Sequence, residues 1–246
     1  MGAALVRHAV RRAAAAGIAR LVISASADTD DFYVAMGAER GADALVLSVP
    51  SALVRFGYDD ISGAYRGDDD VVEEYREWID GLDLDPGARV LDLGCGCGIP
   101  ADRLLVARGA EVLGVDFSEE QVRRARALVP EARFECADIA DWDAPDDAFD
   151  VVVSFYALIH VPRDVQRALA PRLARWLRPG GTLLATIGSA DWTGIDDYLG
   201  QPMFWDHADP DTTIGWLTDA GFDVRSRQFV PEGDSGHELV CAVLRG

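Results

Sequence analysis

ARVLDLGCGCG, residues 88–98, is the stretch of this 246-residue chain that decides its fold. Its apolar half, Val90 to Leu93, follows a Pro-Gly turn signal and predicts a strand buried on both faces of a parallel sheet. Its glycine half lets the backbone turn tightly and lets a ligand approach the main chain. A helix is expected to begin near Pro100 and to offer its unpaired N–H groups to that ligand. Strand, glycine loop and helix together predict half of a nucleotide-binding βαβ unit.

The second half of the unit follows at the expected spacing. EVLGV, residues 111–115, reads as the next strand, and it ends at Asp116. A carboxylate about 20 residues after the first glycine meets the ribose hydroxyls in such units. Ser118 and Gln121 form a capping box, which predicts a helix over 122–128.

The nature of the nucleotide is decided by Asp92. Gly96-x-Gly98-x-x-Ala101 fits the dinucleotide fingerprint, so an NAD-dependent oxidoreductase stays open as a less favoured alternative. Asp92 lies inside the strand, just before the glycines, where a carboxylate repels a diphosphate. The same carboxylate attracts a ligand that carries an ammonium and a sulfonium group.

These motifs together resemble the class I S-adenosylmethionine (SAM)-dependent methyltransferases of the small-molecule "type 11" sort, from about residue 58 to the C-terminus. The resemblance implies an α/β, Rossmann-like fold with a seven-stranded, mostly parallel sheet of order 3-2-1-4-5-7-6, in which strand 7 is antiparallel. It also implies SAM as cofactor and metal-independent transfer of a methyl group to an O or N nucleophile of a small molecule. A SAM-binding regulatory or non-catalytic protein is the alternative from another class.

The resemblance also implies which residues hold the cofactor. Tyr65 matches an aromatic side chain over the methionine end, Asp116 and Phe117 match the ribose and adenine contacts, and CADI, residues 136–139, matches the adenine-edge motif. The expected cofactor residues are Tyr65, Asp92, Gly94, Cys95, Gly96, Asp116, Phe117, Gln121, Asp138, Ile139 and Ser154.

The acceptor is expected beyond the fourth strand, FDVVVS at 149–154, because ligands in such sheets lie at the carboxyl ends of the strands. The run 188–208 reads as a long aromatic loop and predicts a lid. His160 and His207 are the candidate general bases, because the imidazole pKa lies near neutrality. Histidines 8 and 237 read as peripheral. The candidate substrate contacts are Tyr156, Trp192 and Trp205.

Residues 1–50 read as a separate segment. The order helix, strand, FYVAMGA and strand resembles the C-terminal half of the GNAT acetyltransferases. The first strands of that family and most of its acetyl-CoA loop have no counterpart here, so this partial GNAT-like segment is not expected to transfer acetyl groups. Half a sheet leaves an unpaired edge, which the next domain or a second copy in a homodimer would cover. Residues 51–57 read as a linker, and 58–246 as the methyltransferase domain.

The amino-acid composition excludes some classes of binding partner. The net charge is −19, and all 23 basic residues counted as Lys or Arg are arginines. This acidic field repels phosphate backbones and anionic membranes, so neither nucleic acid nor a membrane is an expected partner. The four cysteines lack the second close pair of a zinc site and read as reduced thiols of a cytoplasmic protein. Ser154 and Phe155 stand where metal-dependent catechol-type enzymes carry an aspartate ligand, so no metal is expected.

Overall fold

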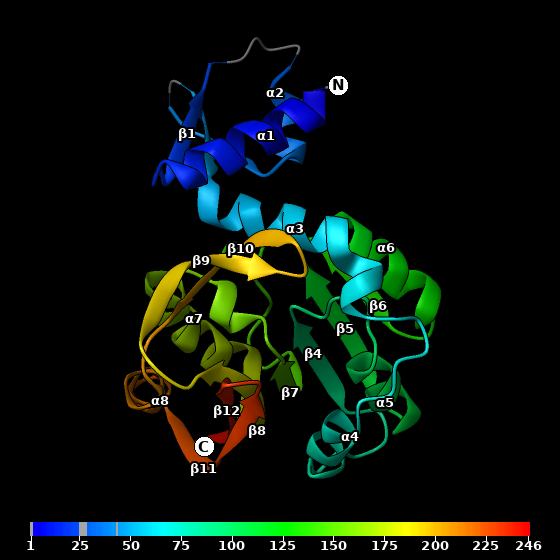
Figure 1. Cartoon of the computed structure of the whole chain (residues 1–246). Coiled ribbons are helices and arrows are strands. Elements are labelled where there is room, and N and C mark those ends of the chain that lie inside the picture. Colours follow the sequence, from blue (N-terminus) through cyan, green and yellow to red (C-terminus); the bar gives the residue numbers. More distant parts are fainter. Residues whose placement is uncertain (1, 25–28, 43) are drawn as a thin grey trace. The chain divides into compact units, whose positions relative to one another are not determined.

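The structure, a computed structural model, describes residues 2–24, 29–42 and 44–246, which divide into two compact units (Figure 1). Unit 1 contains the segment that ends at Ile61 together with Gly194–Phe204. Unit 2 contains Ser62–Thr193 and Trp205–Gly246. Among the described residues, no helix has the length and apolar character needed to cross a bilayer.

Unit 1 is a small α+β unit with a three-stranded antiparallel sheet of order β1-β3-β2. The predicted first helix is present and is followed by Gly17 at φ 69°, a conformation that favours glycine after a helix. Leu47, Val49 and Phe56 belong to the core of this unit. Its elements are α1 (Gly2–Ala15), β1 (Arg20–Ile23), α2 (Asp30–Ala35), β2 (Ala38–Arg40) and β3 (Leu45–Ser48).

The linker predicted over 51–57 is wrong, because these residues lie inside the helix α3 (Val49–Tyr65). Pro50 is in the first turn of α3, where its missing N–H costs no helical hydrogen bond. Leu53 and Phe56 are buried at helical spacing. The predicted domain boundary at residue 58 therefore falls within a helix.

Unit 2 is built on a seven-stranded sheet of order β11-β12-β8-β7-β4-β5-β6 (Figure 1). The strands β8, β7, β4, β5 and β6 are parallel, and β12 is antiparallel to both of its neighbours. This confirms the predicted strand order and the predicted antiparallel strand. The elements are α4 (Glu73–Asp80), β4 (Arg89–Leu93), α5 (Ala101–Ala107), β5 (Glu111–Asp116), α6 (Glu119–Leu128), β6 (Arg133–Cys136), β7 (Phe149–Ser154), η1 (Leu158–His160), α7 (Arg163–Trp176), β8 (Leu177–Gly188), α8 (Pro210–Asp219), β11 (Phe222–Glu232) and β12 (Ser235–Leu244).

Helices cover both faces of this sheet. Val151 and Val153 of β7 pack with α4 and α5, whereas Val152 between them packs with α7 and α8. A central strand with both faces buried reads as a continuous apolar run, and FDVVVS is such a run. Helix α7 continues through Pro171 as one 14-residue helix.

The loop predicted over 188–208 is also wrong. It contains β9 (Trp192–Tyr198) and β10 (Gln201–His207), which form a two-stranded sheet. Leu199 and Gly200 join the two strands with φ of 54° and 81°. Two successive positive φ angles match a type I′ turn, whose twist suits a β-hairpin.

Candidate functional site

A cleft lies at the carboxyl end of β4, with an empty volume of about 360 Å³. Five predicted cofactor residues contribute to its wall, and so do aromatic side chains from α4 and from the segment after β7. The lining residues are Tyr65, Arg66, Tyr75, Asp92, Gly94, Cys95, Gly96, Cys97, Ile99, Ala101 and Phe155.

The floor of the cleft is the glycine loop. Gly94, Gly96 and Gly98 have φ of 76°, 56° and 76°, which only glycine adopts without strain. A Cβ on Gly94 would also lie 2.1 Å from the Cβ of Ala157. The amides of Gly94 and Cys95 both donate to the carbonyl of Val115, at 2.7 and 3.2 Å, which fixes the loop to β5.

Asp116 ties the glycine loop to the helix that follows. Its Oδ2 accepts from the amide of Gly96 at 2.9 Å, and its Oδ1 accepts from the amide of Ser118 at 2.8 Å. The Ser118 hydroxyl caps α6 by accepting from the amide of Gln121, as predicted. The Gln121 side chain accepts instead from the hydroxyl of Ser62, at 2.6 Å. The carboxylate expected at the ribose therefore also holds the shape of the loop.

Six of the predicted cofactor residues lie outside the described lining of the cleft: Asp116, Phe117, Gln121, Asp138, Ile139 and Ser154. Ser154 donates from its hydroxyl to the carbonyl of Leu93 at 2.8 Å and so joins the ends of β7 and β4. Asp138 accepts from the amide of Ala140 at 2.9 Å. Ile139 is buried in the core. Their roles toward a nucleotide stay predictions.

Two buried carboxyl groups lie close together, and one of them, Asp92, lines the cleft. Asp92 and Asp102 are 2% and 0% exposed, and Asp92 Oδ1 and both Asp102 carboxyl oxygens lack hydrogen-bond partners among the described residues. Burial raises the pKa of Asp92 well above its usual range, and the nearby Asp102 raises it further. Burial also raises the pKa of Asp102 to about 7. Two carboxyl groups in such a position resist carrying two charges at once. The sequence did not indicate Asp102.

The residues present fit a cofactor with a charged amino-acid end. Asp92 supplies an unpartnered carboxyl oxygen for an ammonium group. Arg66 also lines the cleft, with its guanidinium 5.2 Å from the ring centroid of Tyr65 and 5.7 Å from that of Tyr75. A guanidinium is suited to bind a carboxylate. Sequence reasoning missed Arg66.

Tyr156 connects the cleft wall with the last strands of the sheet. It has a positive φ of 58°, and its amide donates to the hydroxyl of Thr186 at 2.5 Å. Its ring centroid lies 6.3 Å from those of Tyr75 and Trp78, and 5.2 Å from that of His237. Burial raises the pKa of Tyr156 to about 12, so its phenol stays protonated at neutral pH.

Four of the predicted acceptor-side residues form one row of rings. The ring centroid of His160 lies 5.3 Å from that of Trp205, Trp205 lies 5.9 Å from Trp192, and Trp192 lies 6.1 Å from His207. His160 is buried, whereas Trp192 is 40% exposed. The structure thus brings together side chains that η1 and the two ends of the predicted lid provide.

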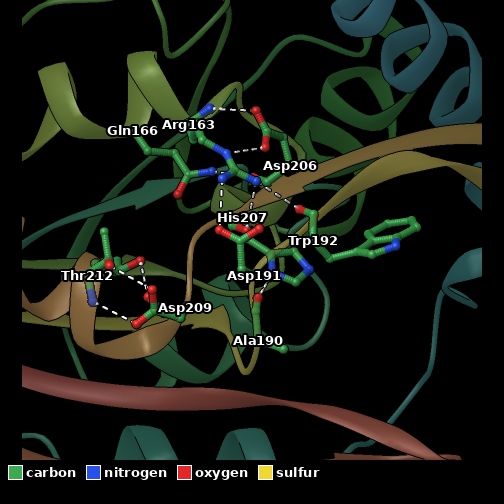
Figure 2. A network of polar contacts seen from close by, with 10 residues as sticks. Arg163, Gln166, Ala190, Asp191, Trp192, Asp206, His207, Asp209 and Thr212 are labelled. Carbon is green, nitrogen blue, oxygen red and sulfur yellow. Dashed lines mark hydrogen bonds and ion pairs between the residues drawn. The ribbon is translucent and has the colours of Figure 1, made fainter.

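Arg163 holds the two ends of that segment together (Figure 2). Its guanidinium contacts the carboxylates of Asp206 and Asp191 at 2.7 and 2.9 Å, and it donates to the carbonyls of Trp192 and His207 at 3.3 and 3.2 Å. An arginine in the first turn of a helix opposes the helix dipole. That unfavourable position is the sequence signal that Arg163 has acidic partners elsewhere.

His207 is held by a separate contact. Its Nδ1 lies 2.5 Å from the carbonyl oxygen of Ala190 (Figure 2). Its ring packs over Gly188, where a Cβ would lie 2.2 Å from Nδ1. A carbonyl only accepts, so this contact places the ring proton on Nδ1. Burial lowers the pKa of His207.

Comparison with known proteins gives a consistent picture. Residues 90–181 match a family model described as a methyltransferase domain. The chain is 32% identical over 177 residues to phosphoethanolamine N-methyltransferase 3 of Arabidopsis thaliana, over 70% of this chain and 33% of that protein. It is 38% identical over 141 residues to 2-methyl-6-phytyl-1,4-hydroquinone methyltransferase of Synechocystis sp., over 56% of this chain and 42% of that protein.

A solved structure supports the same fold. The SAM-dependent methyltransferase of Mesorhizobium loti is 26% identical, with a TM-score of 0.58, over 70% of this chain and 98% of that one. The match to the two curated relatives spans less than half of their length.

Proposed function

We propose that this chain, which carries a methyltransferase domain of the SAM-dependent class I fold, transfers a methyl group from SAM to an oxygen or nitrogen nucleophile of a small molecule without a metal ion. The observation that carries the proposal is Asp92 Oδ1, buried at the cleft without a hydrogen-bond partner among the described residues. A buried carboxyl oxygen is costly unless a donor reaches it, and an ammonium group is such a donor. A diphosphate is not.

The residues of the cleft would bind and orient the cofactor. SAM supplies an electrophilic methyl group when it is bound. Asp92 and Arg66 would hold the ammonium and the carboxylate of its amino-acid end, and the glycine loop would let it approach the main chain. Tyr65 and Phe155 would exclude water from the sulfonium side. Alignment of the nucleophile behind the methyl carbon is then the main contribution of the protein.

The acceptor would lie between the cleft and the row of rings. Tyr156, Trp192 and Trp205 are its proposed contacts, and His160 and His207 stay candidates for the base that removes its proton. The names of the two relatives refer to phosphoethanolamine and to a hydroquinone, which supports a small-molecule acceptor.

Calorimetric measurement of Tm with SAM, S-adenosylhomocysteine or NAD⁺ present tests which cofactor the chain binds. SAM at about 100 times its Kd should stabilise the chain by about 2.7 kcal/mol, which for a chain of this size raises Tm by roughly 5–10 °C. NAD⁺ should leave Tm unchanged. A rise in Tm with NAD⁺ and no rise with SAM would favour the alternative of an NAD-dependent oxidoreductase.

Turnover is tested by S-adenosylhomocysteine release with a panel of phenols, amines and carboxylic acids. Release with one of these compounds, unchanged by EDTA, is expected. SAM binding without release from the panel or from a small-molecule extract would favour the regulatory alternative.

The proposal also covers the N-terminal segment and the cellular location of the protein. We further propose that residues 1–50 are a partial GNAT-like segment, that the chain forms a homodimer through this segment, and that the protein is cytoplasmic. Val22 on β1 is 70% exposed, which supports the dimer, because an apolar edge strand tends to pair. Sedimentation of the full chain and of Val22→Lys would separate dimer from monomer.

A further inference from the structure

His237 lies at the carboxyl edge of the sheet, although its place in the sequence looked peripheral. Because β12 runs antiparallel to β8, its first residues lie beside the last residues of β8, and His237 pairs with Gly188. His237 alternates with Leu239 along the strand, so both side chains point to the same face. Leu239 packs in the cluster that contains Tyr75 and Phe155, two residues of the cleft wall.

One aromatic ring separates His237 from the cleft. Its imidazole meets the ring of Tyr156 edge-on at 5.2 Å between centroids, and Tyr156 lies 6.3 Å from Tyr75. The side chain of His237 is 14% exposed. A small molecule that packs against Tyr156 would therefore meet the imidazole.

Glu232 lies beside this imidazole. In the β11–β12 hairpin Val230 pairs with His237, and Glu232, two residues further along β11, projects to the same face. Nδ1 of His237 lies 3.2 Å from Oε2 of Glu232, an ion-pair distance without hydrogen-bond geometry, and the histidine holds the pKa of Glu232 below its usual range. A carboxylate beside Nδ1 favours the tautomer with the proton on Nδ1, which leaves the lone pair on Nε2.

Resting on the proposed function, we propose that Nε2 of His237 is the general base of the methyl transfer. The proton of the acceptor O–H or N–H moves to Nε2 while the electron pair of the acceptor forms the bond to the methyl carbon. The carbon–sulfur bond breaks, and its electron pair stays on sulfur to give S-adenosylhomocysteine. The imidazolium, stabilised by Glu232, then loses its proton to water.

The other two histidines at this edge are less suited to the role. The Nδ1 contact of His207 is a neutral carbonyl, which stabilises an imidazolium less than a carboxylate does, and burial lowers its pKa. His160 is buried against Trp205. His237 has both a carboxylate on one nitrogen and partial exposure.

Steady-state kinetics with matched variants test the proposal. With the panel compound that releases the most S-adenosylhomocysteine, His237→Asn should lower kcat/KM at least about 100-fold, the size of a general-base contribution. Glu232→Gln should lower it about fivefold, as for an exposed ion pair. Asp234→Asn removes an exposed acid from the same turn and should change nothing. The Kd of SAM should stay within about twofold in all three, since none of these residues lines the cleft. Unchanged turnover in His237→Asn would overturn the proposal.

Nitrogen-15 NMR gives a second readout that needs no acceptor. In mildly alkaline buffer with S-adenosylhomocysteine present, long-range ¹H–¹⁵N spectra should show the Nδ1–H tautomer of His237. The signals of this ring are assigned because they are missing from the spectrum of His237→Asn. Glu232→Gln should shift the tautomer population toward Nε2–H. A dominant Nε2–H tautomer in the unmodified chain would refute the assignment even if no panel compound reacts. Failure of the chain to bind SAM would instead contradict the proposed function. The failure of the proposed function and the failure of the His237 proposal are therefore distinguishable.

Discussion

Two buried acids, Asp92 and Asp102, carry the least ordinary chemistry at the scale of single residues. Asp92 could be predicted, because an acid inside an apolar strand before three glycines is unusual by itself. Asp102 could not, because an acid in the first turn of a helix is ordinary and favours the helix dipole. Its complete burial depends on how α5 packs, which no local pattern reveals.

The buried pair makes stability depend on pH. The pKa of Asp102 is raised from 3.8 to about 7, so the folded chain binds this proton more tightly than the unfolded chain. Stability from this group is therefore full below about pH 4 and is lost as the pH rises through about 7. Asp102→Asn should raise Tm above pH 7 and should make the decrease of Tm between about pH 4 and pH 7 less steep. Part of this decrease should remain, because Asp92 is still present. Calorimetric scans across this range check it, with the exposed Asp69→Asn as control. An unchanged slope in Asp102→Asn would contradict the raised pKa of Asp102.

At the scale of elements, the parallel strands were predictable and the hairpin was not. β4, β5 and β7 read as apolar runs because both of their faces are buried. Most of β9 is exposed, so it shows no alternation of apolar and polar residues. The part of α3 over residues 51–57 was predicted as a linker, and Gly57 is its last residue. Gly57 fits there because Met203 packs against it, where a Cβ would lie 2.6 Å from Sδ.

Arg163 is the element-scale contact that we expect to matter most for the acceptor side. Arg163→Ala removes the donors to Asp206, which is largely buried, and so leaves an unsatisfied carboxylate. This should lower the free energy of unfolding by about 1–3 kcal/mol and change the fluorescence of Trp192 and Trp205. Urea unfolding and emission spectra measure both. Arg167→Ala, an exposed arginine on the same helix, should leave them unchanged, and equal effects of the two variants would refute the role of Arg163.

At the scale of the molecule, the order of the strands decides which distant residues meet. The predicted order, with an antiparallel strand 7 beside strand 5, already implied that the first residues of that strand lie at the carboxyl edge. Applied to the sequence, this rule would have found His237, which distance along the chain made look peripheral. The contact with Glu232 needs the register of the last hairpin, which the sequence does not specify to the residue.

The composition of unit 1 leads to a prediction about where the chain can be divided. Residues Gly194–Phe204 belong to unit 1, where Arg11 contacts Gln201 at 2.7 Å and Met203 is fully buried. A cut at the predicted boundary therefore removes the packing partners of the hairpin. The fragment 58–246 should still bind SAM, but it should bind the dye ANS and unfold at a lower temperature than the full chain.

Met203→Ser should lower the free energy of unfolding of the full chain by about 2–4 kcal/mol, as for truncation of a buried methionine. In the fragment the same change should instead reduce ANS binding, because there the methionine is exposed. A fragment with the Tm of the full chain and no ANS binding would show that the hairpin does not depend on the N-terminal residues.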